Sequence, residues 1–429
     1  MRITILTAGT RGDVVPFVAL GQGLKAAGHD VQLASHRCFT SLVNEGGLQA
    51  VTIAGNPREI NEGQAGQALL ESGSNPIRFA RWYARAVEPL VEEILLDSWQ
   101  VCQGSEAIVA NPPAFYSYDI AEKLGVPFYM GGLVPLSANP DFPIATMPDL
   151  GRFFSLYNHL TYPLVRLLIW QLFRQPINQW RQSTLKLSPL SVWQDPFDRM
   201  ERQGVPYLYG YSAAVLPRPA TWSDNFHVTG YWFLDRADDW TPPPGLVRFL
   251  AAGSPPVYIG FGSMKGANPE ITTNIVLKAL TKTGQRGILL TGWGGLGKVD
   301  LPDTVFQLDF APHDWLFPQV SAAVHHGGAG TTAAALRAGI PSVVVPFFAD
   351  QSFWGYRLAQ LGLGAQPIPK KQLSAESLAT AIRSIVCDRA LRHRTATISK
   401  QIQAEDGVAE AVKAFHQHLS SRQLAIEKH

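Results

Sequence analysis

The sequence predicts an α/β protein with two halves, each built from parallel strands that alternate with helices. The 429-residue chain is long enough for two ordinary domains. In both halves, short β-branched or aliphatic runs typical of buried strands are followed by longer segments typical of helices. A proline-rich stretch with the run Pro242–Pro243–Pro244–Gly245 separates the two series. We therefore expect a domain in residues 1–216, a linker in 217–245 and a second domain in 246–407.

The first half opens with a strand, a loop, a helix and a second strand. We expect these strands over residues 2–7 and 30–35, and the helix over 15–27, where Gly28 stops it. The loop over 8–13 lacks the G-x-G-x-x-G spacing of a dinucleotide fingerprint, which disfavours NAD binding. The same alternation continues with strands over 107–111 and 127–130 and a helix around 118–124.

Between Pro135 and Tyr207 the pattern changes, because aromatic and aliphatic side chains crowd onto helix-like segments. These side chains are Phe153, Phe154, Leu156, Tyr157, Tyr162, Leu168, Trp170, Phe173 and Trp180. The most apolar stretch, 153–173, carries charge and an expected break at Tyr162–Pro163, so it does not predict a transmembrane helix. Two interpretations stay open: core or lid packing, and an apolar acceptor pocket that also makes a weak contact with a membrane surface.

The second half repeats the alternation of strands and helices. Strands are expected over residues 257–261, 287–291, 305–310, 322–324 and 341–346. Helices are expected over 271–283, 314–317, 331–339, 375–387 and from 390 to about 419.

A glycine-rich turn follows the strand over 322–324. The chain runs through His325 and His326 into Gly327–Gly328–Ala329–Gly330 and then into a helix. Such a turn is a ready anion site, because unpaired N–H groups and the positive end of the helix dipole point at one place. The next strand delivers Asp350 and Gln351 beyond its carboxyl end, where open α/β sheets bind ligands. Together these features indicate a sugar attached to a phosphate.

The strings HHGGAGTT and PFFADQSFWG in this stretch resemble the donor-binding signature of the GT-B glycosyltransferases of family one, the UDP-glycosyltransferase superfamily. The likeness is greatest to the sterol 3-beta-glucosyltransferase-like branch and covers nearly the full chain. It implies a GT-B fold, with two Rossmann-like domains facing a central cleft. It also implies that a C-terminal helix over about 408–429 packs back on the first domain, and that transfer inverts the anomeric centre.

The resemblance implies a catalytic base on the first loop. In the family, a catalytic residue stands three positions before a proline, and this slot, ahead of Pro16, is Asp13. Plant members have a histidine there, oriented by an aspartate, and the slot of that aspartate is Asn111 here. A carboxylate can accept the acceptor's hydroxyl proton directly and has no tautomer to fix. The alternative for Asp13 is a helix N-cap.

The resemblance also implies the groups that hold the donor. The diphosphate is expected to contact Ser263, His326, Gly328, Ala329, Gly330 and Thr331. A structural role for His325 stays open. Asp350 and Gln351 resemble the paired residues that hold the sugar's ring hydroxyls, which favours glucose. The nucleobase is expected near Trp293, Phe310 and Ala311. The choice between uracil and thymine as the base stays open, because plant members have a tryptophan at the position of Phe310.

The composition and the remaining motifs limit the possible partners, cofactors and cellular location of the protein. A net charge of +2 without a Lys/Arg-rich run disfavours nucleic acid. No Asp-x-Asp motif is present, and the string Asp235–Arg–Ala–Asp238 has the wrong spacing, so we expect neither a metal nor another cofactor. The scattered cysteines Cys38, Cys102 and Cys387 and the lack of a signal peptide favour a cytoplasmic protein. The oligomeric state stays open.

The sequence therefore predicts a metal-independent, inverting glycosyltransferase that moves glucose from UDP-glucose to a sterol-like or other lipophilic, polycyclic alcohol. One alternative is a tailoring enzyme that places a TDP- or UDP-sugar on a macrolide, flavonoid or similar aglycone; Asp350 and Gln351 favour a fully hydroxylated sugar instead. A UDP-sugar 2-epimerase is disfavoured by the aromatic segment between Pro135 and Tyr207. A non-catalytic sugar-nucleotide-binding protein is disfavoured by Asp13 and His326.

Overall fold

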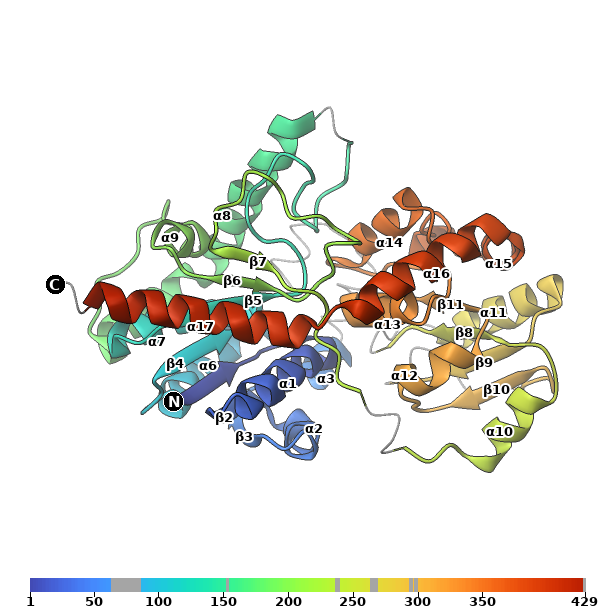
Figure 1. Ribbon diagram of the computed structural model, residues 1–429, viewed down its shortest axis with the longest axis horizontal. Coiled ribbons are helices and arrows are strands. Elements are labelled where there is room, and N and C mark those ends of the chain that lie inside the picture. The colour runs from blue at the N-terminus through green and yellow to red at the C-terminus, as the bar shows by residue number, and fades with distance from the viewer. Residues whose placement is uncertain are drawn as a thin grey trace. The chain divides into compact units, whose positions relative to one another are not determined.

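The computed structural model describes residues 1–62, 86–151, 154–235, 240–262, 269–292, 296 and 300–426. Within these residues the chain forms two compact units (Figure 1). Unit 1 lies within Met1–Ile60, Pro76–Leu234 and Glu405–His429, and unit 2 is formed mainly by Asp235–Ala404. Each unit is an α/β layer structure on a parallel sheet, which confirms the predicted fold class. The expected domain boundaries stay a prediction.

The sheet of unit 1 has the strand order β3-β2-β1-β4-β5-β6-β7, and all its neighbours are parallel. The strands are β1 (Arg2–Leu6), β2 (Asp30–His36), β3 (Gln49–Ile53), β4 (Ala107–Ala110), β5 (Phe128–Gly132), β6 (Tyr207–Tyr209) and β7 (Phe226–Val228). The order reverses between β1 and β4. This switch point is where ligands bind in open α/β sheets, beyond the carboxyl ends of the strands.

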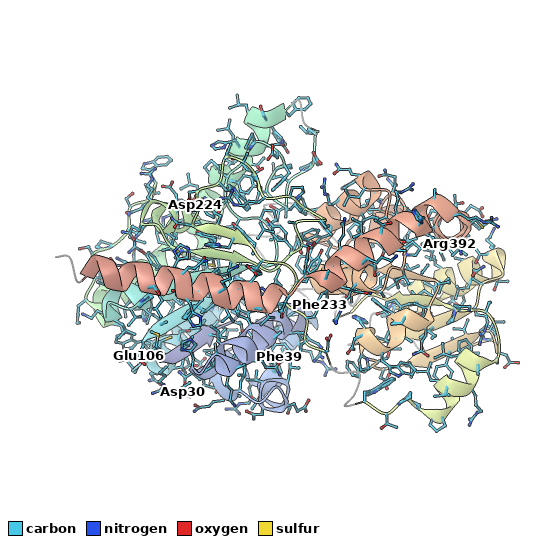
Figure 2. The ribbon with its side chains drawn as sticks, in the orientation of Figure 1. Asp30, Phe39, Glu106, Asp224, Phe233 and Arg392 are labelled. Carbon is cyan, nitrogen blue, oxygen red and sulfur yellow. The ribbon has the colours of Figure 1, made fainter. Side chains whose placement is uncertain are left out.

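The amino end of this sheet is tied together by neighbouring strands. Asp30 and Glu106, which are labelled in Figure 2, lie there at the starts of β2 and β4. The N–H of Arg2 donates to Oε2 of Glu106 over 2.6 Å, and the N–H of Asp30 donates to the carbonyl of Met1 over 2.8 Å. The opposite, carboxyl edge carries the loops that hold the candidate site.

The helices of unit 1 pack on this sheet or on other helices. They are α1 (Arg11–Ala26), α2 (Thr40–Glu45), α3 (Pro57–Glu62), α6 (Glu88–Val101), α7 (Ser117–Leu124), α8 (Ser155–Trp180), α9 (Pro196–Arg202) and α17 (Gly407–Ile426). The expectation that the first helix begins at residue 15 was wrong, since α1 begins at Arg11 after the N-cap Thr10. Asp13 therefore lies in the first turn of α1, three residues after the N-cap.

The expected break at Tyr162–Pro163 was also wrong, because α8 runs through both Pro163 and Pro176. A proline inside a helix removes one hydrogen bond, and tertiary contacts can compensate for that loss. Tyr162 and Trp170 are buried on the inner face of α8. The Tyr162 hydroxyl accepts a hydrogen bond from Nδ2 of Asn139 over 2.8 Å, and Nε1 of Trp170 donates to the carbonyl of Ser191 over 2.9 Å. Packing decides the structure here, not local propensity.

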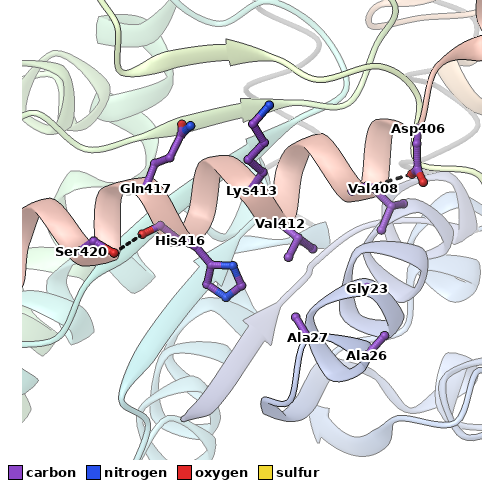
Figure 3. A pocket seen from close by; sticks show the side chains of 11 residues that line it. Gly23, Ala26, Ala27, Asp406, Val408, Val412, Lys413, His416, Gln417 and Ser420 are labelled. Atoms are coloured by element: carbon purple, nitrogen blue, oxygen red, sulfur yellow. Dashed lines mark hydrogen bonds between the residues drawn. The ribbon is translucent and has the colours of Figure 1, made fainter.

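The helix expected from 390 to about 419 is two helices, α16 (Arg389–Ala404) in unit 2 and α17 in unit 1. The chain breaks at Glu405–Asp406, where Oδ1 of Asp406 accepts the N–H of Ala409 over 2.9 Å and so starts α17. Helix α17 packs on α1 and the sheet, and the Tyr129 hydroxyl donates to the carbonyl of Phe415 over 2.9 Å. Figure 3 shows Val408, Val412 and His416 on the side of α17 that faces α1.

The sheet of unit 2 has the order β10-β9-β8-β11-β12, again with all neighbours parallel. Its strands are β8 (Val257–Gly260), β9 (Gly287–Leu290), β10 (Val305–Leu308), β11 (Ala322–His325) and β12 (Ser342–Val344). Its helices are α10 (Pro244–Ala251), α11 (Pro269–Thr283), α12 (His313–Leu316), α13 (Ala329–Arg337), α14 (Gln351–Gln360), α15 (Ala375–Cys387) and α16. Apolar clusters pack around these strands, and the order reverses between β8 and β11.

Candidate active site

The candidate residues of both units follow the strands that flank a switch point. In unit 1, the loop with Asp13 follows β1 and Asn111 follows β4. In unit 2, Gly262 follows β8 and the His326 turn follows β11. Ligands of open α/β sheets bind at such places. Each unit thus carries its own group of candidate residues.

Asp13 forms a reciprocal pair with the N-cap residue of α1. Its Oδ2 accepts the backbone N–H of Thr10 over 2.7 Å and the Thr10 hydroxyl over 3.0 Å. The N–H of Asp13 donates to the carbonyl of Thr10 over 3.0 Å. Gly9, with φ of +123°, passes so close that an added Cβ would lie 2.5 Å from Oδ2. The N-cap alternative is therefore corrected in one respect: Thr10 is the cap, and Asp13 supports it from the first turn.

Two buried side chains hold the loop that carries Asp13. Oδ1 of Asn111 accepts the N–H of Ala8 over 3.1 Å, and its Nδ2 donates to the carbonyl of Ala8 over 2.8 Å. Nε2 of His36 accepts the N–H of Gly9 over 3.2 Å, while its Nδ1 lies 2.9 Å from the carbonyl of Ala54. This pattern requires the proton on Nδ1 of His36. His36 was not among the predicted site residues, although a polar residue at the carboxyl end of a buried strand was a usable signal.

Burial shifts the pKa values of Asp13 and His36. It raises the pKa of Asp13 above its ordinary value, and the two hydrogen bonds from Thr10 oppose part of that rise. A carboxyl with a raised pKa is a better proton acceptor than an ordinary aspartate. Burial lowers the pKa of His36, which keeps the imidazole neutral and able to accept the N–H of Gly9.

In unit 2 the glycine turn leads directly into α13. Gly328 is the N-cap, and α13 begins at Ala329, two residues earlier than expected. The N–H of Thr332 already donates to the carbonyl of Gly328 over 3.0 Å. The N–H groups from Gly328 to Thr331 therefore precede the helical hydrogen-bond ladder and can bind an anion. These are four of the six residues that were expected to contact the diphosphate, and the other two are Ser263 and His326.

The ring of His326 lies between two glycines. An added Cβ on Gly328 would stand 2.4 Å from Nε2 of His326, and one on Gly262 would stand 3.1 Å from its Cε1. Nδ1 of His326 is buried and has no hydrogen-bond partner among the described residues. Burial lowers the pKa of His326 to about 4, so the ring is neutral at pH 7. A neutral ring with an unused nitrogen is suited to a phosphate oxygen.

His325 has a different environment. It is the last residue of β11 and is fully buried. Its Nδ1 accepts the N–H of Gly327 over 3.1 Å, which shapes the turn from inside. This geometry gives His325 a structural role, and His326 follows it at the start of the glycine turn.

The glycine turn and the pair Asp350–Gln351 lie against each other. Gly327, with φ of +90°, passes so close to α14 that an added Cβ would stand 2.7 Å from the carbonyl oxygen of Gln351. Oε1 of Gln351 accepts the N–H groups of Phe347 over 2.7 Å and of Phe348 over 3.2 Å, so part of this amide already holds the preceding loop. Ala349 has φ of +56°, an uncommon conformation for a residue with a Cβ. Such local strain clusters at ligand sites.

The nucleobase region is described only in part. Ser263 and Trp293 lie outside the described residues. Phe310, beyond the end of β10, is exposed. The side chain of Ala311 is buried in the core beside Leu316, so a contact with a nucleobase there would come from its backbone. Nearby, the Thr291 hydroxyl donates to Oδ1 of Asp309 over 2.7 Å.

Among the described residues, no three His, Cys, Asp or Glu side chains come together as a metal site would need. The cysteines Cys38, Cys102 and Cys387 are all free thiols. Within the same residues, no helix combines the length and the apolar character that crossing a bilayer requires.

Two family models match the chain. Residues 3–139 match the glycosyltransferase family 28 N-terminal domain, and residues 294–417 match the C-terminal domain of erythromycin biosynthesis protein CIII-like. Solved structures with the same fold include the glycotransferase of kitacinnamycin, with a TM-score of 0.69 at 18% identity over 97% of this chain and 98% of that one. CalG4, the calicheamicin glycosyltransferase, has a TM-score of 0.66 at 18% identity over 98% of both chains. At these identities the likeness shows the fold.

Curated relatives are more similar in sequence. A sterol 3-beta-glucosyltransferase of Arabidopsis thaliana is 40% identical over 427 residues, which are 98% of this chain and 68% of that protein. A sterol 3-beta-glucosyltransferase of Cryptococcus neoformans is 35% identical over 452 residues, which cover 100% of this chain but only 28% of the longer fungal protein. The chain therefore belongs to the sterol 3-beta-glucosyltransferase family of GT-B glycosyltransferases.

Proposed function

We propose that this hexosyltransferase transfers glucose from UDP-glucose to the hydroxyl of a sterol. The observation that carries the proposal is the 40% identity over 98% of the chain to a sterol 3-beta-glucosyltransferase. The matched region spans both units, since it covers 98% of the chain. The relatives' name suggests a sterol as the acceptor. Asp13 could serve as the base, and His326 with the N–H groups of the glycine turn could bind the diphosphate.

In the proposed reaction, the acceptor oxygen attacks the anomeric carbon while the bond from that carbon to the β-phosphate oxygen breaks. The hydroxyl proton passes to the carboxylate of Asp13, and UDP leaves with the electron pair. This single displacement inverts the anomeric centre. Asn111 and His36 contribute by holding Ala8 and Gly9, the residues immediately before Thr10. They are positioning residues, because they act through the loop and not on the substrate.

The proposed donor site uses the turn of unit 2. The N–H groups from Gly328 to Thr331 and the ring of His326 would hold the diphosphate and stabilise its charge as it departs. This arrangement needs no metal. Asp350, at the start of α14, and the part of Gln351 that faces the sugar would hold the hexose hydroxyls.

A second candidate is a tailoring enzyme that uses a TDP-sugar on an aglycone. It is supported by the match of residues 294–417 to the erythromycin-type model. The structures of similar fold also include the glycosyltransferase VinC in complex with dTDP, at 16% identity. Because 16% identity shows the fold alone, this candidate ranks second.

The test is to measure nucleotide release from UDP-glucose and from TDP-glucose with EDTA present. The acceptors are a sterol, a flavonoid, a macrolide aglycone and a blank without acceptor. Sterol-dependent UDP release, with a β-linked product by the anomeric coupling constant in NMR, supports the proposal and its metal independence. Release that requires the macrolide or TDP-glucose favours the second candidate. An α-linked product, or activity lost with EDTA and restored by a divalent metal, contradicts the corresponding part of the proposal.

A further inference from the structure

Two buried aromatic rings meet at the carboxyl edge of the unit 1 sheet, one helical turn from Asp13. Phe17 lies on α1, four residues after Asp13, and is fully buried. The ring of Trp232 meets the ring of Phe17 edge-on, with centroids 5.3 Å apart and planes at 85°. Residues four apart lie on the same face of a helix, so Asp13 and Phe17 project from one side of α1. The contact of Phe17 therefore bears on the turn that carries the candidate base.

Two glycines on one face of the sheet leave the space that these rings occupy. An added Cβ on Gly131, in β5, would stand 2.5 Å from Cε1 of Phe17. One on Gly210, directly after β6, would stand 2.9 Å from Cδ2 of Trp232. Gly131 pairs with Leu208, so Gly210, two residues further on, lies on the same face. Neither glycine has a positive φ, so the space and not the backbone conformation requires them.

Trp232 is fastened to the sheet. Its Nε1 donates to the Thr229 hydroxyl over 2.9 Å, and that hydroxyl donates to the carbonyl of Tyr209 over 3.1 Å. The backbone just before Trp232 is fixed as well, because an added Cβ on Gly407, at the start of α17, would stand 2.4 Å from the carbonyl oxygen of Tyr231. The ring of Trp232 is therefore a fixed wall beside α1.

The hydrogen bonds described above leave the position of α1 itself to packing. Asn111 and His36 bind Ala8 and Gly9, which precede the helix. Asp13 belongs to the first turn of α1 and moves with it. In a reaction that transfers a proton to a positioned group, a misplacement of about 1 Å can cost about 10²-fold in rate. The contacts that set the position of α1 therefore matter for the chemistry as well as for the fold.

We propose that Phe17 and Trp232 are positioning residues for the transfer reaction, because their ring contact fixes the turn of α1 that holds Asp13. This inference rests on the proposed function, in which Asp13 is the base. The two rings act through the helix and not on the substrate. Their loss should therefore reduce the rate of the chemical step and leave the affinity for UDP, whose proposed site lies in unit 2, unchanged.

The first test displaces Phe17 with a single methyl group. Gly131→Ala puts a Cβ 2.5 Å from the Phe17 ring, and the matched control Gly287→Ala, at the amino end of β9, puts one 2.5 Å from Cδ1 of Leu280 in unit 2. Both variants should lower the melting temperature, since both overpack a buried site. Only Gly131→Ala should lower kcat, by about tenfold or more, with the calorimetric affinity for UDP unchanged. A wild-type kcat in Gly131→Ala, or an equal loss in Gly287→Ala, would overturn the proposal.

The second test removes the ring of Trp232 in the presence and in the absence of the base. Trp232→Leu should lower kcat by about tenfold or more, and the milder Trp232→Phe, which keeps an aromatic ring, should lose less. In an Asp13→Asn background, Trp232→Leu should lower turnover little further, because no carboxylate is left to misplace. A general loss of folded protein would instead multiply with the loss from Asp13→Asn, and that outcome would contradict the positioning role.

A pH–rate profile gives a readout that a loss of stability alone would not change. The surroundings of Asp13 raise its pKa, mainly through burial. A displaced carboxylate should titrate closer to its ordinary value, so the acid limb of kcat/KM should move to lower pH in Gly131→Ala. An acid limb at the wild-type pH would count against displacement of Asp13.

Hydrogen exchange of the backbone amides of residues 8–20, measured on the full chain, requires no turnover. It should become faster in Gly131→Ala and Trp232→Leu and stay unchanged in Gly287→Ala. Unchanged exchange in the first two variants would show that these rings do not hold α1, whether or not a sterol is the acceptor. Transfer to a sterol at an equal rate in all variants would overturn the positioning role and leave the proposed function intact.

Discussion

The side-chain amide of Asn111 closes two hydrogen bonds with the backbone of Ala8, at 3.1 Å and 2.8 Å. The amide thus hydrogen-bonds to both the N–H and the carbonyl of Ala8, which lies in the loop that leads to Asp13. An aspartate at this position would match only the N–H of Ala8 and would set its second oxygen against the carbonyl. Asparagine therefore suits a loop whose base is itself a carboxylate, since it adds order without adding negative charge.

Replacing Asn111 by alanine should lower kcat and leave the affinity for UDP unchanged, because the loop of Asp13 loses its support in unit 1 while the donor half-site in unit 2 is untouched. Asn111 is buried, so the variant should also unfold more easily, by about 1–3 kcal/mol. Turnover and calorimetric UDP affinity should be measured well below the melting temperature. Asn111→Asp keeps the acceptor for the N–H of Ala8 but sets a carboxylate oxygen against the carbonyl of Ala8, so it should also lose stability at pH 7. A normal kcat in Asn111→Ala would remove the positioning role.

Replacing Asp13 by asparagine should cut turnover by about 10²–10⁴-fold, the usual contribution of a general base. The amide can still accept the N–H of Thr10, so α1 should keep its start and the melting temperature should change little. Rapid-quench turnover and UDP-glucose affinity separate the two effects. Turnover close to that of the wild type would leave Asp13 with its structural pairing to Thr10 as its only role.

The acid limb of kcat/KM should lie above the ordinary pKa of an aspartate, because burial raises the pKa of Asp13 and only the ionised form accepts a proton. Activity should therefore fall as the pH drops through this raised pKa. Thr10→Ala removes the hydroxyl that stabilises the carboxylate, so its acid limb should move to still higher pH. A pH–rate profile of both proteins checks this order. A limb that moves to lower pH in Thr10→Ala would contradict it.

Both His326→Ala and Gly328→Ala should weaken UDP binding, by roughly tenfold or more if the ring donates to the diphosphate. In Gly328→Ala the ring of His326 is displaced, because the new Cβ would stand 2.4 Å from its Nε2.

Gly330→Ala is the control for stability, since its Cβ would meet no atom within 4 Å. It should keep or raise the melting temperature, whereas Gly328→Ala should lower it. Calorimetric UDP affinities equal to the wild type in His326→Ala would exclude this histidine from the phosphate site.

Stability should fall as the pH drops from about 6.5 towards 4, because α17 is joined to unit 1 through two histidine pairs. Nε2 of His227 lies 2.7 Å from Nε2 of His418, and Nε2 of His29 lies 2.8 Å from that of His416. Burial, together with the neighbouring His418 and Arg218, lowers the pKa of His227 to about 4. A lowered pKa means that the unfolded chain binds the proton more readily, so stability is present above about 6.5 and lost below it. Melting temperatures at several pH values check this sign.

His227→Gln should flatten that dependence, because it removes one of the groups that titrate differently in the folded and unfolded chain. His393→Gln, at an exposed position on α16, is the control and should leave the slope unchanged. A slope that is the same in all three proteins would assign the acid sensitivity to other groups.

The sequence predicted the parts of the fold that local chemistry determines. The turn from β11 into α13 needs glycines at fixed positions, and Gly327 has φ of +90° as such a turn requires. The strands β1, β4, β8 and β11 were visible because almost all of their residues are buried, so most of these residues are aliphatic or β-branched. The N–H groups from Gly328 to Thr331 were expected from the glycine turn, although the helix start was expected at Thr331 and lies at Ala329.

The remaining errors and omissions depend on distant contacts. Pro163 suggested a break, and only the burial of Tyr162 and Trp170 against unit 1 explains why α8 continues. His36 was missed because its role depends on Gly9, which lies 27 positions away. The short strands β6 and β7 have three residues each and are recognised through their pairing with neighbours. The hydrogen bonds that the Gln351 amide accepts from Phe347 and Phe348 are local, and the sequence analysis overlooked them for a different reason: it assigned the side chain of Gln351 to the sugar alone.

The place of α17 has a consequence for the order in which the protein can fold during synthesis. Unit 1 needs α17 to cover Tyr129 and Gly23, yet α17 follows all of unit 2 in the chain. Residues that emerge first from the ribosome must therefore wait, with this side of α1 and β5 uncovered, until unit 2 has been translated. Unit 2 has no such delay, because nearly all of its own sequence is contiguous. We therefore infer that the half of the molecule made second is the first to be complete.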